Sequence, residues 1–252
     1  MFHKITLSFW IDSLFAVATF NKDFVMLARK VYRILRSWKG FETIKHAMNV
    51  YPGIDWYISG GVVRNAASGI NGFLADFDFF VKGEQIQAML QELMNYGTLK
   101  CGQFGSPRWW PMVDEMAYAD IIPVHKFFNG LEKCHDIVDV LNQFDFTANA
   151  IAIDLRRMLV INPRDGMHDA QEHIIRAVRF DYPDEPIHPG SSLSRNLVLW
   201  CRLLHYASKL NFCIDPGTLS WLKMNMAYVN DAYLFESEFF ELYNKAFAPL
   251  YC

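Results

Sequence analysis

The sequence predicts an α+β fold, in which a small mixed β-sheet flanked by helices is followed by an all-helical C-terminal domain. Three observations support this prediction. Strand and helix patterns alternate over residues 50–180. A glycine-rich turn separates the first strand pattern from the helix pattern that follows it. From about Ser192 onward, the chain shows only helical patterns.

Residues 1–49 are predicted to form an N-terminal segment that packs on the sheet domain. The apolar stretch from Ile5 to Phe20 is too short and too interrupted to span a bilayer, so a packed element is favoured over a membrane anchor or a cleaved leader. The pattern from Phe24 to Asn49 is that of one amphipathic helix, with Arg29 and Arg33 one turn apart on its outer face. We therefore expect a basic helix ahead of the sheet.

The sheet domain is predicted over residues 50–180. Its helices are expected at Val62 to Ser68 and at Glu84 to Tyr96. Its strands are expected at Trp56 to Ile58, Leu74 to Val81, Thr98 to Cys101, Trp109 to Met112, Ala117 to Ile122, Ala150 to Asp154 and Leu159 to Ile161.

The helical domain is predicted over residues 181–252. The Pro- and acid-rich run from Asp181 to Pro186 indicates the boundary between the two domains. The clearest helix patterns in this domain run from Arg195 to Leu210 and from Glu236 to Phe247.

Charge and cysteine content limit the classes of protein to consider. The 24 basic and 27 acidic residues give a net charge of −3, which excludes a uniformly basic nucleic-acid-binding surface. The 5 cysteines are odd in number and lack CxxC spacing, which argues against a disulfide framework and a structural zinc site. A protein of the reducing cytoplasm, with no membrane partner, is expected.

Two carboxylates stand one residue apart in the second predicted strand, at Asp76 and Asp78. Because side chains at i and i+2 share a face of a strand, both carboxylates point the same way, while Phe77 and Phe79 point to the other side. Two Cα atoms at this spacing lie ~6.6 Å apart, which suits two Mg²⁺ ions about 3.5–4 Å apart. The pair therefore suits a two-Mg²⁺ site for phosphoryl transfer, whereas by itself such a pair is also typical of a solvated strand end.

The glycine-rich turn lies upstream of this acid pair. Ser59, Gly60 and Gly61 leave backbone N–H groups free at the start of a helix, where the helix dipole also favours phosphate oxygens. Arg64, one turn into that helix, is placed to add a bidentate contact to a triphosphate. The turn and the acid pair together indicate a metal-dependent nucleotidyl-transfer site.

A third carboxylate is needed to complete the metal set or to accept the proton of an attacking hydroxyl. Asp120, in the strand-like run from Ala117 to Val124, is the natural candidate. Asp114 and Glu115 compete with it, but their positions are typical of a hairpin turn.

These motifs resemble those of a known family. GGVVRN from Gly60 followed by DFDFFV from Asp76 resembles the GGxVRD and DxD motifs of the DNA polymerase β-like nucleotidyltransferases, in the branch of tRNA CCA-adding enzymes and bacterial poly(A) polymerases. The resemblance covers roughly residues 50–215. Further matching segments are Gln103 to Gly105 (FGT-type), Asp145 to Asp154 (RRDFTINALALD), Asn162 to Arg176 (DPxGGxxDLxxxxIR) and Arg202 to Phe212 (RAVRFAARLGF).

The resemblance implies a nucleotidyltransferase head followed by a helical neck-like domain. It implies that two Mg²⁺ ions are held by Asp76, Asp78 and Asp120, which would also be the catalytic acids. It further implies that the triphosphate lies against Ser59, Gly60, Gly61 and Arg64, and that Asp145, Asn149 and Arg202 face the nucleotide from the neck.

The activity that the resemblance implies is transfer of a nucleoside monophosphate from an NTP, ATP or CTP, to a hydroxyl acceptor. The favoured acceptor is an RNA 3′ end of tRNA type. A nucleotidyltransferase of this kind would be an enzyme of the 2.7.7 class. The oligomeric state is left open, with a homo-oligomer as one alternative.

The chain also departs from the family pattern. Asn65 stands where the family has Asp, Gln143 and Phe144 replace an Arg pair, and Leu199 and His205 replace Arg on the later helix. These changes keep a rival open: a catalytically altered protein of this fold that binds nucleotide, RNA or a protein partner. A third alternative is an enzyme that nucleotidylates a protein or a small molecule.

The run Arg108-Trp109-Trp110 has two interpretations. Adjacent tryptophans beside a basic residue can stack a base. Hairpin packing is favoured, because the run is followed directly by a proline.

Overall fold

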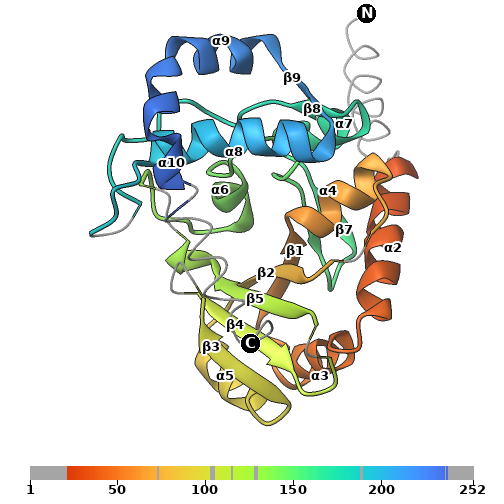
Figure 1. Ribbon diagram of the computed structural model, residues 1–252. Helices are drawn as coiled ribbons and strands as arrows, with labels where there is room; N and C mark the ends of the chain where they lie inside the picture. The colour runs from red at the N-terminus through yellow and green to blue at the C-terminus, as the bar shows by residue number, and fades with distance from the viewer. Residues whose placement is uncertain are drawn as a thin grey trace, which may run out of the picture.

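A seven-stranded mixed sheet forms the centre of the molecule (Figure 1). The structure is a computed structural model that describes residues 22–72, 74–102, 106–114, 116–127, 130–187, 190–235 and 237. Four sets of residues singled out in the sequence lie outside this part of the chain: Ile5 to Phe20, Gln103 to Gly105, Glu115, and, apart from Ser237, Glu236 to Phe247.

The sheet has the strand order β3-β4-β5-β2-β1-β6-β7. Only β2 and β5 run parallel, and every other neighbouring pair is antiparallel, so the predicted mixed sheet is confirmed. The strands are β1 (Asp55–Ser59), β2 (Asp76–Lys82), β3 (Gly97–Cys101), β4 (Pro107–Pro111), β5 (Tyr118–Pro123), β6 (Ala152–Asp154) and β7 (Leu159–Ile161).

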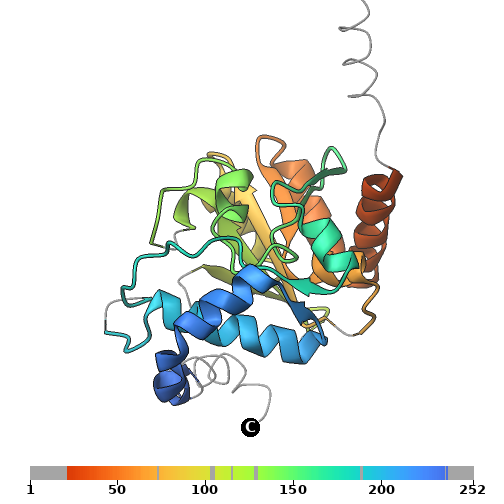
Figure 2. The same cartoon turned by 90° about the horizontal axis from the view of Figure 1, so that it is seen from above.

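The helices come before, between and after these strands. Those of the sheet domain are α2 (Lys22–Ser37), α3 (Phe41–Val50), α4 (Gly61–Ser68), α5 (Ile86–Leu93), the 3₁₀ helix η1 (Val124–Lys126), α6 (Ile137–Leu141) and α7 (Gly166–Gln171). Those that follow are α8 (Arg195–Leu210), α9 (Pro216–Met224), η2 (Met226–Asp231) and α10 (Ala232–Leu234). Seen from above, α8, α9 and α10 form a layer on one side of the sheet domain (Figure 2).

The basic segment before the sheet is two helices, and the prediction of one helix from Phe24 to Asn49 is wrong in this respect. The chain turns between α2 and α3 at Trp38 to Gly40. The Trp38 ring stacks on Phe77 of β2, with centroids 4.6 Å apart, and a Cβ at Gly40 would lie only 2.4 Å from that ring. Burial of the tryptophan therefore breaks a helix pattern that local periodicity alone would continue.

The two faces of the sheet are covered differently. Trp56, Ile58 and Phe79 point into a large core that also receives apolar side chains of α2, α3, α4 and α5. Tyr57 and Phe80 point to the other face, into a smaller cluster built with α6. Asp76 and Asp78 share this second face, because β2 alternates its side chains as predicted. That face therefore carries the acid pair.

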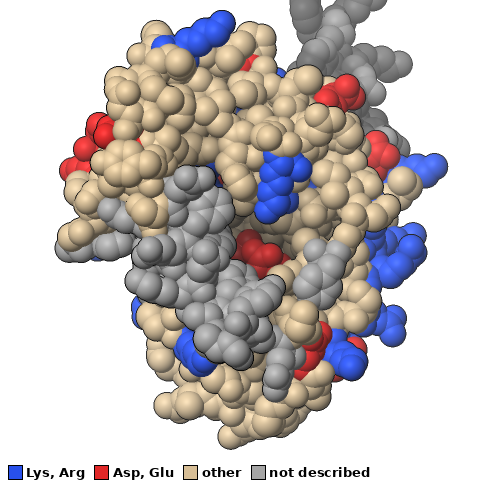
Figure 3. All heavy atoms as spheres, in the orientation of Figure 1, with Lys and Arg blue, Asp and Glu red and all other residues tan. Residues whose placement is uncertain are grey.

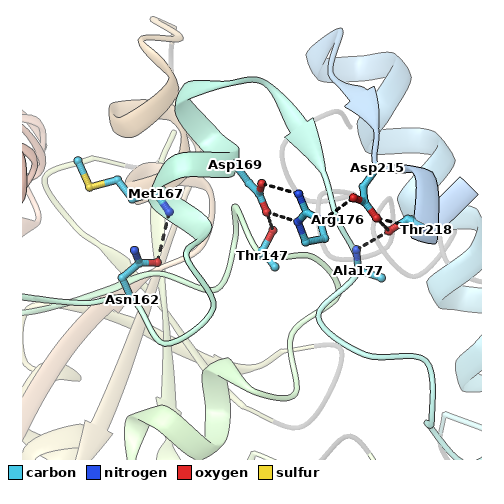
Figure 4. Close-up of polar contacts among 8 residues, drawn as sticks. All are labelled: Thr147, Asn162, Met167, Asp169, Arg176, Ala177, Asp215 and Thr218. Atoms are coloured by element: carbon cyan, nitrogen blue, oxygen red, sulfur yellow. Dashed lines mark hydrogen bonds and ion pairs between the residues drawn. The ribbon is translucent and has the colours of Figure 1, made fainter.

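The C-terminal layer is joined to the sheet domain by an ion-pair network built around a buried carboxylate (Figure 4). Asp169 of α7 is 2% exposed and accepts hydrogen bonds from Thr147 Oγ1 (2.6 Å) and Arg176 Nε (2.9 Å). Arg176 also pairs with Asp215, which caps α9 by accepting from the backbone of Thr218. One arginine therefore ties α7 to the first turn of α9.

The C-terminal layer also contains a short strand. β9 (Cys213–Ile214) pairs in parallel with β8 (Ile174–Ile175), so the expectation of a purely helical C-terminal domain misses this pairing. No helix within the described ranges combines the length and apolar character needed to cross a membrane.

Candidate active site

The glycine turn joins β1 to α4 and lies directly against the acid pair. Gly60 has φ +72°, and a Cβ at this residue would be 2.3 Å from Asp78 Oδ2. A side chain at position 60 would therefore be strained and would displace the carboxylate. Ser59, the predicted phosphate ligand before it, is buried and donates through Oγ to the carbonyl of Ile151 at 2.7 Å. Its hydroxyl holds the turn to the residue just before β6. Helix α4 begins at Gly61, and the N–H groups of its first turn lack intrahelical partners.

The acid pair lies in the middle of the sheet. Asp78 is opposite Ser59 of β1 on one side and opposite Asp120 of β5 on the other, so the turn and the predicted third acid flank it. Burial raises the pKa of Asp78 well above the ordinary value, and the charges of Asp76 and Asp120 raise it further. Loss of solvent, followed by the charge of Asp120, also raises the pKa of Asp76. Such clustered anions favour a cationic ligand.

Asp120 already has a cationic partner. Arg108, opposite it on β4, donates from Nε to Asp120 Oδ1 at 2.7 Å and from a terminal nitrogen to Oδ2 at 2.8 Å. The guanidinium also lies over the ring of Tyr118, 4.3 Å from its centroid. Both carboxylate oxygens of Asp120 are therefore engaged by one arginine, which the sequence interpretation of the Arg108-Trp109-Trp110 run did not anticipate.

The acid pair offers oxygen ligands, which suit a hard divalent cation. Asp76 and Asp78 supply carboxylate oxygens from one face of a strand, and Mg²⁺ prefers such ligands. Within the described part of the chain, however, no set of three or more Asp, Glu, His or Cys side chains is arranged to hold a metal ion. In this structure the third member of the predicted set, Asp120, is hydrogen-bonded to Arg108. Metal binding by these residues stays a prediction.

The remaining predicted site residues form one hydrogen-bonded network between α4 and α8. Arg64 donates to Asn149 Oδ1 at 2.7 Å, Asn149 donates to Asp145 Oδ1 at 3.1 Å, and Arg202 donates to Asp145 Oδ2 at 2.7 Å. Burial lowers the pKa of Arg64, which is only 7% exposed. The structure therefore brings together all four residues, and their contact with a nucleotide stays a prediction.

Two further residues belong to this network and were not predicted. The ring of Tyr206 lies under the guanidinium groups of Arg64 and Arg202, at 5.4 and 5.2 Å from its centroid, and under Lys209 at 5.9 Å. Tyr206 and Lys209 follow Arg202 by four and seven residues on α8. That helical spacing is the sequence signal that would have identified them.

The acid pair and this network belong to opposite sides of one opening. The positive charges of Lys209 and Arg202 partly oppose the rise in the pKa values of Asp76 and Asp78, respectively. Figure 3 shows a hollow in the same face of the molecule, with acidic atoms at its floor and basic atoms above them. Comparison with Figure 1 places the acidic floor over β2 and the basic rim below α8.

The sequence and the structure are similar to those of known tRNA-processing nucleotidyltransferases. A curated CCA-adding enzyme of Limosilactobacillus reuteri (strain DSM 20016) is 38% identical over 85 residues, which are 34% of this chain and 19% of that enzyme. The solved Thermotoga maritima CCA-adding enzyme in complex with tRNA matches 80% of this chain and 47% of its own, with a TM-score of 0.58 and 20% identity. A tRNA nucleotidyltransferase solved with a primer tRNA and an incoming ATP analogue matches 75% of this chain and 52% of its own, with a TM-score of 0.54 and 24% identity.

The chain has the head and neck fold of CCA-adding enzymes. The predicted resemblance and fold class are thereby confirmed. No family model matches the chain. The matched segment spans about a fifth of the length of the curated CCA-adding enzyme, and the structural matches span about half of the solved ones.

The departures from the CCA-adding pattern have structural roles here. Asn65 accepts two hydrogen bonds from Arg64, at 2.9 and 3.1 Å, and so fixes the direction of that guanidinium. Gln143 is buried and donates to the carbonyl of Glu132, while Phe144 packs against Phe80. Leu199 is buried in the main core. These four residues thus contribute hydrogen bonds and packing contacts to this structure.

Proposed function

We propose that this protein is a Mg²⁺-dependent nucleotidyltransferase that moves a nucleoside monophosphate from ATP or CTP to the 3′ hydroxyl of an RNA of tRNA type. The observation that carries the proposal is the position of Asp78, which lies between the Gly60 turn and Asp120 in the strand register. The fold shared with CCA-adding enzymes supports it, since the solved relatives include complexes with tRNA and with an ATP analogue.

In this proposal, each part of the site has a separate task. The N–H groups at the start of α4 bind phosphate oxygens, and Gly60 allows the phosphates to approach Asp78. Asp76 and Asp78 hold Mg²⁺, which would neutralise the phosphates and stabilise the charge of an in-line displacement. The expectation of two ions remains part of the proposal.

The neck side of the site positions the nucleotide. Asp145 accepts a hydrogen bond from Arg202, and Asn149 accepts one from Arg64, so the two arginines orient these side chains. The positive charges gathered over Tyr206 favour the polyanionic NTP and the RNA backbone.

Transfer of label from an NTP labelled at its α-phosphate to a tRNA lacking its 3′ terminus tests the proposal. Wild-type protein with Mg²⁺ is expected to transfer the label, and Asp76→Asn to lose at least about 100-fold in rate, because a metal ligand supplies several kcal/mol of transition-state stabilisation. Asp181→Asn, which changes an exposed acid of the surface, is the matched control and should keep the wild-type rate. Equal transfer by wild type and Asp76→Asn would overturn the proposal.

One observation favours the rival function, a module that binds without catalysis. The donors of Arg64 and both oxygens of Asp120 are engaged inside the protein. Calorimetry with ATP or CTP separates the two functions: an enzyme requires Mg²⁺-dependent NTP binding, whereas a module for a protein partner shows no such binding. Labelling in a lysate that marks a protein or a small molecule in place of RNA would support the third alternative.

A further inference from the structure

Hydrogen bonds and an aromatic ring fix the ion pair between Arg108 and Asp120. The two residues are directly opposite on antiparallel β4 and β5, with side chains only 9% and 13% exposed. Two parallel hydrogen bonds of 2.7 and 2.8 Å use both carboxylate oxygens, which is the strongest geometry for such a pair. The ring of Tyr118 lies against the guanidinium. The pair is therefore an ordered, largely buried part of the site.

This pair lies beside the acids that are proposed to bind metal. Asp120 is the parallel partner of Asp78 across the β2–β5 register, so its carboxylate belongs to the same group of charges. The group contains three carboxylates, and Arg108 is the cation hydrogen-bonded to one of them. Its positive charge partly offsets the rise in the pKa of both Asp76 and Asp78, in the same direction as a bound cation would act.

We propose that Arg108 sets the divalent-cation affinity of this site by competing with the cation for Asp120. While Arg108 holds Asp120, only Asp76 and Asp78 are available, and the positive charge nearby weakens a divalent cation at that pair. A second cation enters only when Asp120 exchanges the arginine for the metal. The inference rests on the proposed function for one point, the binding of metal by Asp76 and Asp78.

Binding of Mn²⁺ alone, followed by the electron paramagnetic resonance signal of the free ion, tests this inference without any measure of activity. Arg108→Met keeps an apolar side chain against Tyr118 and removes the charge. It is expected to lower the Mn²⁺ dissociation constant at least about tenfold, since Asp120 becomes a free anion next to the pair. Arg108→Lys, which keeps the charge and loses the two-point contact, should lie between this variant and wild type.

The double variant Arg108→Met/Asp120→Asn removes the pair without changing the net charge, so it carries the test even where Arg108→Met alone does not fold. Its Mn²⁺ affinity should stay within about threefold of wild type, because Asp120 is not a ligand while Arg108 holds it. A loss as large as that of Asp76→Asn would show that Asp120 already binds the metal, and would overturn the inference. An unchanged or weaker affinity of folded Arg108→Met would overturn it too.

Two further variants separate this inference from the proposed function. Arg179→Met removes a two-point Arg–Asp pair from the surface, where Arg179 binds Asp181 at 2.6 and 2.7 Å, and should leave Mn²⁺ binding unchanged. Asp76→Asn should weaken Mn²⁺ binding. If it does not, the proposed metal pair itself is wrong; if it does while Arg108→Met has no effect, only the role of Arg108 is wrong.

Discussion

At the scale of single residues, this site concentrates charges that oppose folding. Burial and two neighbouring carboxylates raise the pKa of Asp78, so its ionised form is less stable in the folded protein than in the unfolded chain. The neighbouring Gly60 turn lies so close to that carboxylate that no side chain fits between them. Such a cost is typical of a functional site, where stability is given up for binding.

Asp78→Asn is therefore expected to stabilise the metal-free protein. Because the folded-state pKa lies above the ordinary 3.8, the stability that protonated Asp78 contributes is present below pH 3.8 and is lost as the pH rises through the raised value. In EDTA at pH 7, the variant should melt about 2–4 °C above wild type, and the difference should shrink towards pH 4. Thermal melts by circular dichroism from pH 4 to 8 measure this.

The control for that experiment is Asp181→Asn. Its carboxylate is 69% exposed and pairs with Arg179 at the surface, so the melting temperature should change by less than about 1 °C at every pH. A melting temperature of Asp78→Asn below that of wild type at pH 7 would contradict the expected sign.

At the scale of elements, one arginine joins the sheet domain to the C-terminal layer. Arg176 follows β8 and binds Asp169 of α7 on one side and Asp215 at the start of α9 on the other (Figure 4). Asp169 is 3% exposed as a side chain, so it depends on Arg176 and Thr147 for neutralisation and hydrogen bonds. The position of α9 therefore depends on a charge buried in α7.

Removal of Arg176 should consequently destabilise the connection between α7 and α9. Arg176→Met leaves the buried Asp169 without its cation. Because the arginine side chain is itself 43% exposed, the free energy of unfolding is expected to fall by about 2–3 kcal/mol, at or below the lower end of the range for broken buried ion pairs. Urea denaturation followed by tryptophan fluorescence measures the free energy of unfolding.

Arg179→Met is the matched control, because it breaks an Arg–Asp pair whose acid is 69% exposed. Its loss should be below about 1 kcal/mol. Equal losses in the two variants would show that the connection between α7 and α9 is not held by the buried pair.

At the scale of the whole molecule, the sheet and the C-terminal helices share one hydrophobic core. The main cluster contains Val31 of α2, Phe79 of the sheet, Leu203 of α8 and Leu222 of α9. The predicted division near residue 181 therefore crosses a continuous apolar interior. Two domains that share such a core are expected to unfold together.

Differential scanning calorimetry should accordingly show one transition, with a calorimetric enthalpy close to the van't Hoff value. Leu203→Ala, which removes a fully buried side chain from α8, should lower the stability by about 2–5 kcal/mol and keep the transition single. Two separated transitions in either protein would indicate that the C-terminal helices fold independently.

The sequence by itself determined the features that depend on local order. The strands predicted at Trp56 to Ile58 and Leu74 to Val81 overlap β1 and β2. The glycine turn and the common face of Asp76 and Asp78 likewise follow from turn chemistry and alternation, and the structure has both. The predicted helix from Arg195 to Leu210 coincides with α8 for the same reason. Local patterns such as these do not require knowledge of the partner elements.

Only the tertiary structure decided which charges meet. Arg108 is twelve residues from Asp120, and the two become partners because the β4–β5 register places them opposite each other. Arg64 donates to Asn149, 85 residues away in the sequence, because α4 packs beside the segment after α6. The break of the first helix likewise depends on Trp38 reaching Phe77 of the sheet. Contacts between elements are set by register and packing, and a single strand or helix pattern holds no information about either.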